Sequence, residues 1–330
     1  MIIIAGDIGG THTRLLCVEM TSAVTQTLAR QTYQSKNYSG LEQIVDQFIS
    51  DNHITEINAI CLGVAGPIKV GEVAVTNLPW HVSEKSLKKK YAIKQVTLLN
   101  DFAAIAYAIP SFESHELLTL QQGVDDGPQS FAIVGAGTGL GSCHVITDNN
   151  VIKPLGSEAG HCSFAPENNQ QCELLQWMWQ TKQFVSVESL VSGRGIASIY
   201  QFLKYKKMAV ENNLVAEKFK DHDPARVITE HANEDELSQF SVELFVEIYA
   251  AAIRNIILHY HPLSSIYIAG GIALKIRNFI ESEKFIDSFM NNEVMHDYLK
   301  SISIKLVLDE NPGLKGVLEY CHLNYHLTGV

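Results

Sequence analysis

The pattern of apolar and polar residues predicts mixed strands and helices in the first half of the chain and more helix in the second. Residues 2–7 are an apolar run that predicts a buried strand, and residues 14–19 predict another after a glycine-rich turn. Residues 131–135 and 142–147 repeat this design around a second glycine-rich turn. Each pair is expected to be a hairpin rather than a strand-to-helix unit.

The other predicted strands and helices are recognised from the spacing of their apolar residues. The segment 207–236 is instead polar and charged, which predicts an excursion of the chain over the surface. The repeated hairpins suggest two α/β halves that arose by duplication and enclose a cleft, with a boundary near residue 110. The remaining predicted strands are 57–65, 95–99, 265–269 and 302–308; the predicted helices are 39–50, 102–109, 168–182, 187–206 with an interruption near Gly193 and Gly195, 237–259, and a final helix that starts at 311–313.

Composition and charge argue against several classes of protein. The chain has 330 residues and a net charge of −11, so a polyanion such as nucleic acid would be repelled. No apolar run approaches the roughly 18 residues of a membrane span, and the N-terminus lacks the features of a signal peptide. The six cysteines include no CxxC pair, so His161, Cys162 and Cys172 do not predict a structural zinc site. A protein of the reducing cytoplasm, without a membrane or nucleic-acid partner, is expected.

Both glycine turns have the composition of a phosphate cradle. Glycine lets the backbone approach an anion closely, so that successive N–H groups can point at its oxygens. Neither turn alone excludes a simple tight hairpin, but two in corresponding places favour phosphate binding, with hydroxyls from Thr11 and Thr138. Asp7 precedes the first turn and is a candidate for contact with Mg²⁺, directly or through water. A Walker A loop is excluded because no Gly-Lys-[Ser/Thr] occurs.

Several polar residues could serve catalysis or sugar binding. Asn100 and Asp101 follow the strand 95–99, and either could cap the next helix. Alternatively, Asp101 projects into a cleft and accepts the proton of a substrate hydroxyl. Glu158, His161 and Glu188 could bind the hydroxyls of a sugar, although each alone is more typical of a surface, loop or capping residue.

Eight motifs occur in an order that resembles the bacterial glucokinase family over essentially the whole chain: GDIGGTHTRL, TNLPW, LLNDFAA, GAGTGLG, GSEAGHCSFAP, VSVESLVSGRG, IAGGI and NPGLKG. The resemblance implies an α/β fold of the actin-like ATPase (ribonuclease H-like) type, with two domains and a central cleft. The small domain would comprise residues 1–110, completed by a C-terminal helix at 312–330. The large domain would comprise residues 111–311.

The same resemblance implies the chemistry, which is phosphorylation of glucose at its 6-hydroxyl by ATP with Mg²⁺. Asp101 would be the general base and Asp7 would contact Mg²⁺ through water. The implied glucose-binding residues are Asn100, Asp101, Glu158, His161 and Glu188. The implied nucleotide-binding residues are Gly6, Asp7, Ile8, Gly9, Gly10, Thr11, Gly137, Thr138, Gly139, Gly270 and Gly271.

Three motifs depart from the forms usual in that family. GGTNAR becomes GGTHTR with His12 and Thr13, EGGH becomes EAGH with Ala159, and SGPG becomes SGRG with Arg194. The sequence leaves open a kinase for another hexose, a non-catalytic sugar-binding protein, and whether the chain forms a homodimer. A sugar-responsive repressor is disfavoured because the CxCGxxGC zinc signature is missing.

Overall fold

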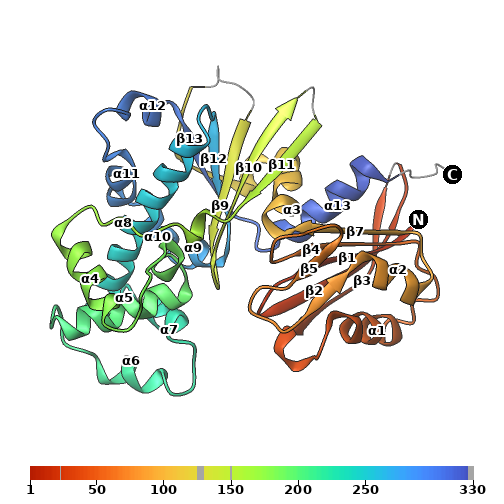
Figure 1. Ribbon diagram of the computed structural model, residues 1–330, viewed down its shortest axis with the longest axis horizontal. Coiled ribbons are helices and arrows are strands. Elements are labelled where there is room, and N and C mark those ends of the chain that lie inside the picture. The colour runs from red at the N-terminus through yellow and green to blue at the C-terminus, as the bar shows by residue number, and fades with distance from the viewer. Residues whose placement is uncertain (23, 125–129, 149–150, 326–330) are drawn as a thin grey trace. The chain divides into compact units, whose positions relative to one another are not determined.

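The computed structural model describes all residues except 23, 125–129, 149–150 and 326–330 (Figure 1). The chain divides into two compact units. Unit 1 comprises Met1–Glu113 with Asn311–Val330, and unit 2 comprises Ser114–Glu310. The last five residues of the predicted C-terminal helix, 326–330, lie outside the described residues.

The described part of unit 1 contains a five-stranded sheet in the order β3-β2-β1-β4-β7. The first three strands form antiparallel pairs, whereas β4 is parallel to both β1 and β7. A two-stranded ribbon, β5 and β6, lies outside this sheet. The strands are β1 (Ile2–Ile8), β2 (His12–Met20), β3 (Thr25–Gln34), β4 (Ala59–Val64), β5 (Glu72–Ala74), β6 (His81–Ser83) and β7 (Gln95–Asn100).

Helices cover the sheet of unit 1. Apolar residues of α1 share a core with one set of sheet side chains, and residues of α3 and α13 share a second core with the alternate set. A Cβ atom at Gly316 of α13 would clash with the Ala104 carbonyl of α3, so this glycine permits close helix packing. The helices of unit 1 are α1 (Leu41–Asp51), α2 (Glu84–Tyr91), α3 (Asp101–Ala108) and α13 (Pro312–Asn324), with 3-10 turns η1 (Ser35–Asn37) and η2 (Ile109–Ser111).

The described part of unit 2 contains a six-stranded sheet in the order β11-β10-β9-β12-β13-β8. β9, β10 and β11 form an antiparallel meander, whereas β12 is parallel to β9 and β13. β8 closes the other edge antiparallel to β13. The strands are β8 (Leu117–Gln121), β9 (Ser130–Ala136), β10 (Leu140–Asp148), β11 (Val151–Ser157), β12 (Ser265–Ile268) and β13 (Ser303–Val307).

The 24-residue helix α8 is the centre of the core of unit 2. Its apolar side chains are buried with those of β9, β12 and the helices α5 and α11. Figure 1 shows α5 and α11 next to α8. The helices of unit 2 are α4 (Asn169–Trp179), α5 (Gly193–Tyr205), α6 (Asn213–Lys218), α7 (Pro224–His231), α8 (Glu236–His259), α9 (Gly271–Lys275), α10 (Arg277–Ile280), α11 (Glu283–Met290) and α12 (His296–Ser301), with 3-10 turns η3 (Ser114–Glu116), η4 (Ala159–His161) and η5 (Val187–Ser189).

The two hairpins predicted from the sequence are confirmed as β1–β2 and β9–β10. The surface excursion predicted for 207–236 is wrong in part, because α7 buries Val227 and Ile228 in that segment. β13 lies between β12 and β8 and is mostly buried. No helix in the described ranges is long and apolar enough to cross a membrane.

Candidate active site

The carboxyl ends of three parallel strands meet at one edge of the unit 1 sheet. Ile8 at the end of β1 is in register with Val64, and Val64 is in register with Asn100 at the end of β7. The first glycine turn, 9–11, and Asn100 therefore follow strands that end at the same edge. Ligands of open α/β sheets commonly bind at such carboxyl ends.

The first glycine turn is fixed by backbone and side-chain hydrogen bonds. The Gly9 N–H donates to the His12 carbonyl oxygen at 3.0 Å, and the Ser35 hydroxyl donates to the Gly9 carbonyl oxygen at 2.9 Å. A Cβ at Gly10 would lie 3.3 Å from the Thr76 carbonyl oxygen, so the TNLPW segment packs against this turn. The Thr11 side chain is exposed beside it.

Asp7 lies partly buried at the end of β1, with its Oδ2 atom 3.2 Å from Arg14 Nη1. Burial raises the pKa of the Asp7 carboxyl above its usual range, and the positive charge of Arg14 opposes this shift only in part. The N-terminal turn of α13 is close, because a Cβ at Gly313 would lie 3.4 Å from Asp7 Oδ1. Asp7 is thus a carboxylate that already has one cationic partner.

Asn100 is the residue that caps α3. Its side-chain oxygen accepts hydrogen bonds from the N–H groups of Phe102 and Ala103, at 3.1 and 3.2 Å. Its amide nitrogen donates to the Gly66 carbonyl oxygen at 3.2 Å and to Asp101 Oδ1 at 2.9 Å. The sequence left the cap open between Asn100 and Asp101, and the structure assigns it to Asn100. Asp101 is therefore not the capping residue of α3.

Asp101 is the first residue of α3, and its carboxylate is oriented from two sides. Its Oδ1 atom accepts from the Asn100 amide and from the Phe102 N–H, the latter at 3.0 Å. Both donors restrain the orientation of this carboxylate.

The second glycine turn, 137–139, joins β9 to β10 in unit 2. The Gly137 N–H donates to the Gly139 carbonyl oxygen at 2.8 Å and closes the turn. Gly270 follows the end of β12, and β12 is parallel to β9, so Gly270 lies close to the end of β9, where the second glycine turn begins. Gly270 has a φ of +105° and a Cβ there would lie 2.9 Å from the Ala136 carbonyl oxygen, so only glycine fits easily.

Glu158 directly precedes η4, and His161 is its last residue. Their side chains are exposed, and Glu158 Oε2 lies 3.6 Å from His161 Nε2. Gly160 between them packs on β10, since a Cβ there would clash with the Leu140 carbonyl oxygen. η4 is therefore held against the strand that follows the second glycine turn.

Glu188 lies in η5 and has a less exposed carboxylate. Its Oε2 atom accepts a hydrogen bond from the Leu140 N–H at 2.9 Å, and its Oε1 atom lies 3.7 Å from Arg194 Nη2. The Val187 N–H donates to the Cys162 carbonyl oxygen at 2.9 Å, which joins η5 to the segment after η4. The contacts of Glu188 with Leu140 and Arg194 were not foreseen from the sequence, where only the unusual SGRG motif pointed to Arg194.

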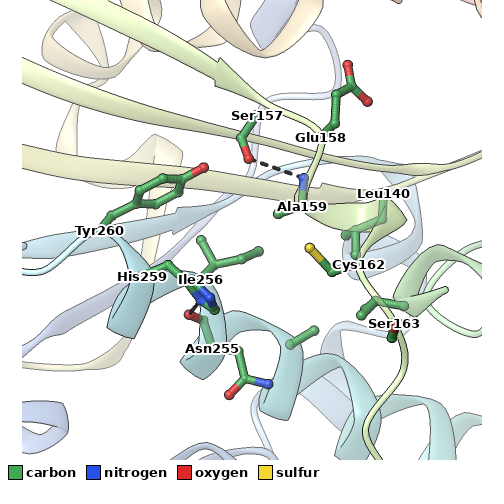
Figure 2. Close-up of a pocket in the computed structure, with 12 residues that line it drawn as sticks. Leu140, Ser157, Glu158, Ala159, Cys162, Ser163, Asn255, Ile256, His259 and Tyr260 are labelled. Carbon is green, nitrogen blue, oxygen red and sulfur yellow. Dashed lines mark hydrogen bonds between the residues drawn. The ribbon is translucent and has the colours of Figure 1, made fainter.

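A cavity of about 550 Å³ in unit 2 lies beside these segments. Figure 2 shows side chains from the end of α8, among them Asn255 and His259, opposite the segment that carries Glu158. The Glu158 carboxylate points away from the α8 side chains in this view. The cavity is lined by Leu140, Ser157, Glu158, Ala159, Cys162, Ser163, Val187, Ala252, Asn255, Ile256, His259 and Tyr260.

The candidate site residues thus fall into two sets, one in each unit. Unit 1 places the first glycine turn and Asn100 at one sheet edge, with Asp7 and Asp101 beside them. Unit 2 joins the second glycine turn, η4 and η5 around Leu140.

Comparisons with family models and with known relatives agree with each other. The model of the glucokinase family matches residues 4–324. A glucokinase from Nostoc sp. is 36% identical over 332 residues, which cover 96% of this chain and 97% of the relative. A glucokinase from Colwellia psychrerythraea is 29% identical over 321 residues, which cover 96% of this chain and 95% of the relative.

Solved structures of similar proteins confirm the actin-like ATPase fold. A glucokinase from an Antarctic psychrotroph has a TM-score of 0.79 and 28% identity, covering 98% of this chain and 99% of its own. A Balamuthia mandrillaris glucokinase in complex with glucose has a TM-score of 0.78 at 18% identity, covering 96% and 92%. A ROK family glucokinase from Streptomyces griseus, in complex with glucose and AMPPNP, has a TM-score of 0.64 at 18% identity, covering 96% and 98%.

The capping role of Asn100 predicts a specific pattern of stability. Asn100→Ala should lower the free energy of unfolding by about 1 kcal/mol, because the Ala103 N–H loses its acceptor and the Phe102 N–H keeps only Asp101 Oδ1. Asn100→Ser should recover most of this loss, since serine also caps helices well. Thermal and urea unfolding of both variants provide the measurement. Equal destabilisation by alanine and serine would show that the cap is not what Asn100 contributes.

Proposed function

Because this chain belongs to the glucokinase family, we propose that it transfers the γ-phosphoryl group of ATP to the 6-hydroxyl of glucose, with Asp101 as the general base. The observation that carries this assignment is the carboxylate of Asp101 at the end of β7. Asn100 caps the helix, so the Asp101 carboxylate is oriented without being needed as the cap.

The proposed reaction needs one proton acceptor. The oxygen of the 6-hydroxyl attacks the γ-phosphorus, the bond from that phosphorus to the β,γ-bridging oxygen breaks, and ADP leaves. The hydroxyl proton passes to the Asp101 carboxylate. The hydrogen bonds from Asn100 and Phe102 fix the orientation of that carboxylate, and a general base must be positioned in this way to reach the hydroxyl proton.

Glucose binding is assigned to five polar residues. Asn100, Asp101, Glu158, His161 and Glu188 combine charged acceptors with amide and imidazole groups, which suits a ligand with several hydroxyls. Support comes from the relatives from Balamuthia mandrillaris and Streptomyces griseus, whose structures are complexes with glucose. Glu158 and His161 have exposed side chains in this structure, so both are accessible to a ligand.

The nucleotide phosphates are assigned to the glycine turns 9–11 and 137–139, and Gly270 and Gly271 are assigned to the adenosine side of the nucleotide. A Cβ at Gly137 or Gly271 would meet nothing within 4 Å, which leaves the backbone at both positions open to a ligand. The Streptomyces griseus relative is a complex with AMPPNP, an analogue of ATP. The proposed nucleotide-binding residues are Gly6, Asp7, Ile8, Gly9, Gly10, Thr11, Gly137, Thr138, Gly139, Gly270 and Gly271.

Magnesium fits this assignment through Asp7. Its carboxylate is of the type that binds Mg²⁺, and the Arg14 contact at 3.2 Å favours a link through water over direct ligation. No group of three or more His, Cys, Asp or Glu side chains that could hold a metal ion occurs among the described residues, so phosphate oxygens and water would complete the coordination. Bound Mg²⁺ would neutralise charge on the phosphates.

Replacement of the proposed base should abolish most turnover. Asp101→Asn keeps the size of the side chain and leaves the Asn100 cap intact, but it removes the proton acceptor. We expect kcat to fall about 10²–10⁴-fold, with a smaller change in glucose affinity and little change in thermal stability. Steady-state kinetics with coupled detection of ADP measures this effect. A variant that retains more than about a tenth of the wild-type kcat would contradict the assignment.

A second substitution tests the sugar site. Glu158→Gln removes a charged acceptor whose hydrogen bond to a sugar hydroxyl is worth about 1.5–3 kcal/mol, so KM for glucose should rise at least tenfold. KM for ATP should change much less, since the Glu158 side chain is exposed and its ionic contact is with His161. Unchanged KM for glucose would mean that the sugar binds elsewhere.

A further inference from the structure

We infer that Glu188 is a positioning residue for the second glycine turn, so that its carboxylate couples sugar binding to nucleotide binding. The inference rests on the proposed function, because it takes the turn 137–139 as a phosphate site and Glu188 as a sugar ligand. What it adds is a contribution of Glu188 to nucleotide affinity when no sugar is present.

The carboxylate of Glu188 lies directly against the turn. The Leu140 N–H, which follows the turn, donates to Glu188 Oε2 at 2.9 Å. A Cβ at Gly139 would clash with the same oxygen, so the carboxylate occupies the space beside this glycine. The Glu188 side chain is only 21% exposed, compared with 62% for Glu158. A charge-assisted bond in a partly buried place restrains the backbone at the end of the turn.

The residues that follow Glu188 hold the start of the same turn. The Gly193 N–H donates to the Gly137 carbonyl oxygen at 2.9 Å. The Ser192 hydroxyl donates to the Glu188 carbonyl oxygen at 2.7 Å and accepts from the Gly195 N–H at 3.1 Å, so it ties η5 to the beginning of α5. The segment 188–195 therefore holds the turn at both ends, by Glu188 and by Gly193.

The two carboxylate oxygens of Glu188 have different partners. Oε2 is bound by the Leu140 N–H, whereas Oε1 lies 3.7 Å from the guanidinium of Arg194, whose side chain is 68% exposed. An exposed ion pair at this distance is weak. A sugar hydroxyl can replace the guanidinium at Oε1 while Oε2 keeps its bond to the turn. Sugar bound at Oε1 would then hold the carboxylate in place and order the phosphate site.

Such a linkage is reciprocal, because two ligands that restrain the same element must raise each other's affinity by the same factor. Glu188→Ala removes both the sugar contact and the anchor of the turn. It should weaken sugar-free binding of Mg-AMPPNP about tenfold, the size of effect expected for one hydrogen bond to a charged group. Glu188→Gln keeps an acceptor oxygen for the Leu140 N–H and should recover a large part of this loss.

The experiment is titration calorimetry of Mg-AMPPNP into the full-length protein, first without sugar and then with saturating glucose. Glu158→Ala is the matched control, because it removes another proposed sugar carboxylate that makes its ionic contact with His161 rather than with the turn. We expect Glu158→Ala to stay within about twofold of wild type without sugar. Glucose should raise the nucleotide affinity of wild type more than that of Glu188→Ala. Thermal melts verify that every variant is folded.

The outcomes separate the inference from the proposed function. If wild type binds Mg-AMPPNP and both Glu188 variants bind it equally well without sugar, the inference is wrong and the proposed function stands. An equal loss in Glu158→Ala would overturn it as well, since the effect would then not depend on contact with the turn. If wild type does not bind Mg-AMPPNP at all, the proposed function itself fails.

Discussion

The backbone of Leu140 is the point at which the functional segments of unit 2 are fixed to one another. Its N–H binds the Glu188 carboxylate, and its carbonyl oxygen lies so close to Gly160 that a side chain there would clash. Its side chain lines the cavity beside both segments. Because Leu140 and Gly141 are paired with β9 in the sheet, the backbone that contacts η4 and η5 is held in one strand conformation. The geometry of three separate stretches of sequence thus depends on one residue of β10.

In unit 1, the register of the parallel strands fixes the positions of the candidate site segments. Ile8, Val64 and Asn100 are aligned by the parallel ladder, so the first glycine turn and the start of α3 are set by sheet hydrogen bonds rather than by loop conformation. Asn100 has two structural roles, since one end of its amide caps α3 and the other donates to Asp101, the proposed base. A site built on strand ends is held more precisely than one built on free loops.

Much of this arrangement could be predicted from the sequence. The hairpins follow from apolar runs around glycine turns, and α8 follows from its helical stripe, because both patterns are local. The cap of α3 could not be assigned, since Asn100 and Asp101 are both good capping residues. The burial of α7 depends on tertiary packing that its polar surroundings conceal. The contact of Glu188 with Leu140 involves a backbone N–H, which has no signature in the sequence.

Substrate selection is the most direct test of whether the chain is an ATP-dependent glucose kinase. The measurement is the initial rate of ADP formation from Mg-ATP with glucose, mannose, fructose, galactose and N-acetylglucosamine in turn. We expect sugar-dependent ADP formation, with the highest kcat/KM for glucose. A kcat/KM for another sugar about tenfold above that for glucose would make the protein a kinase for a different hexose. No sugar-dependent ADP formation would contradict the account.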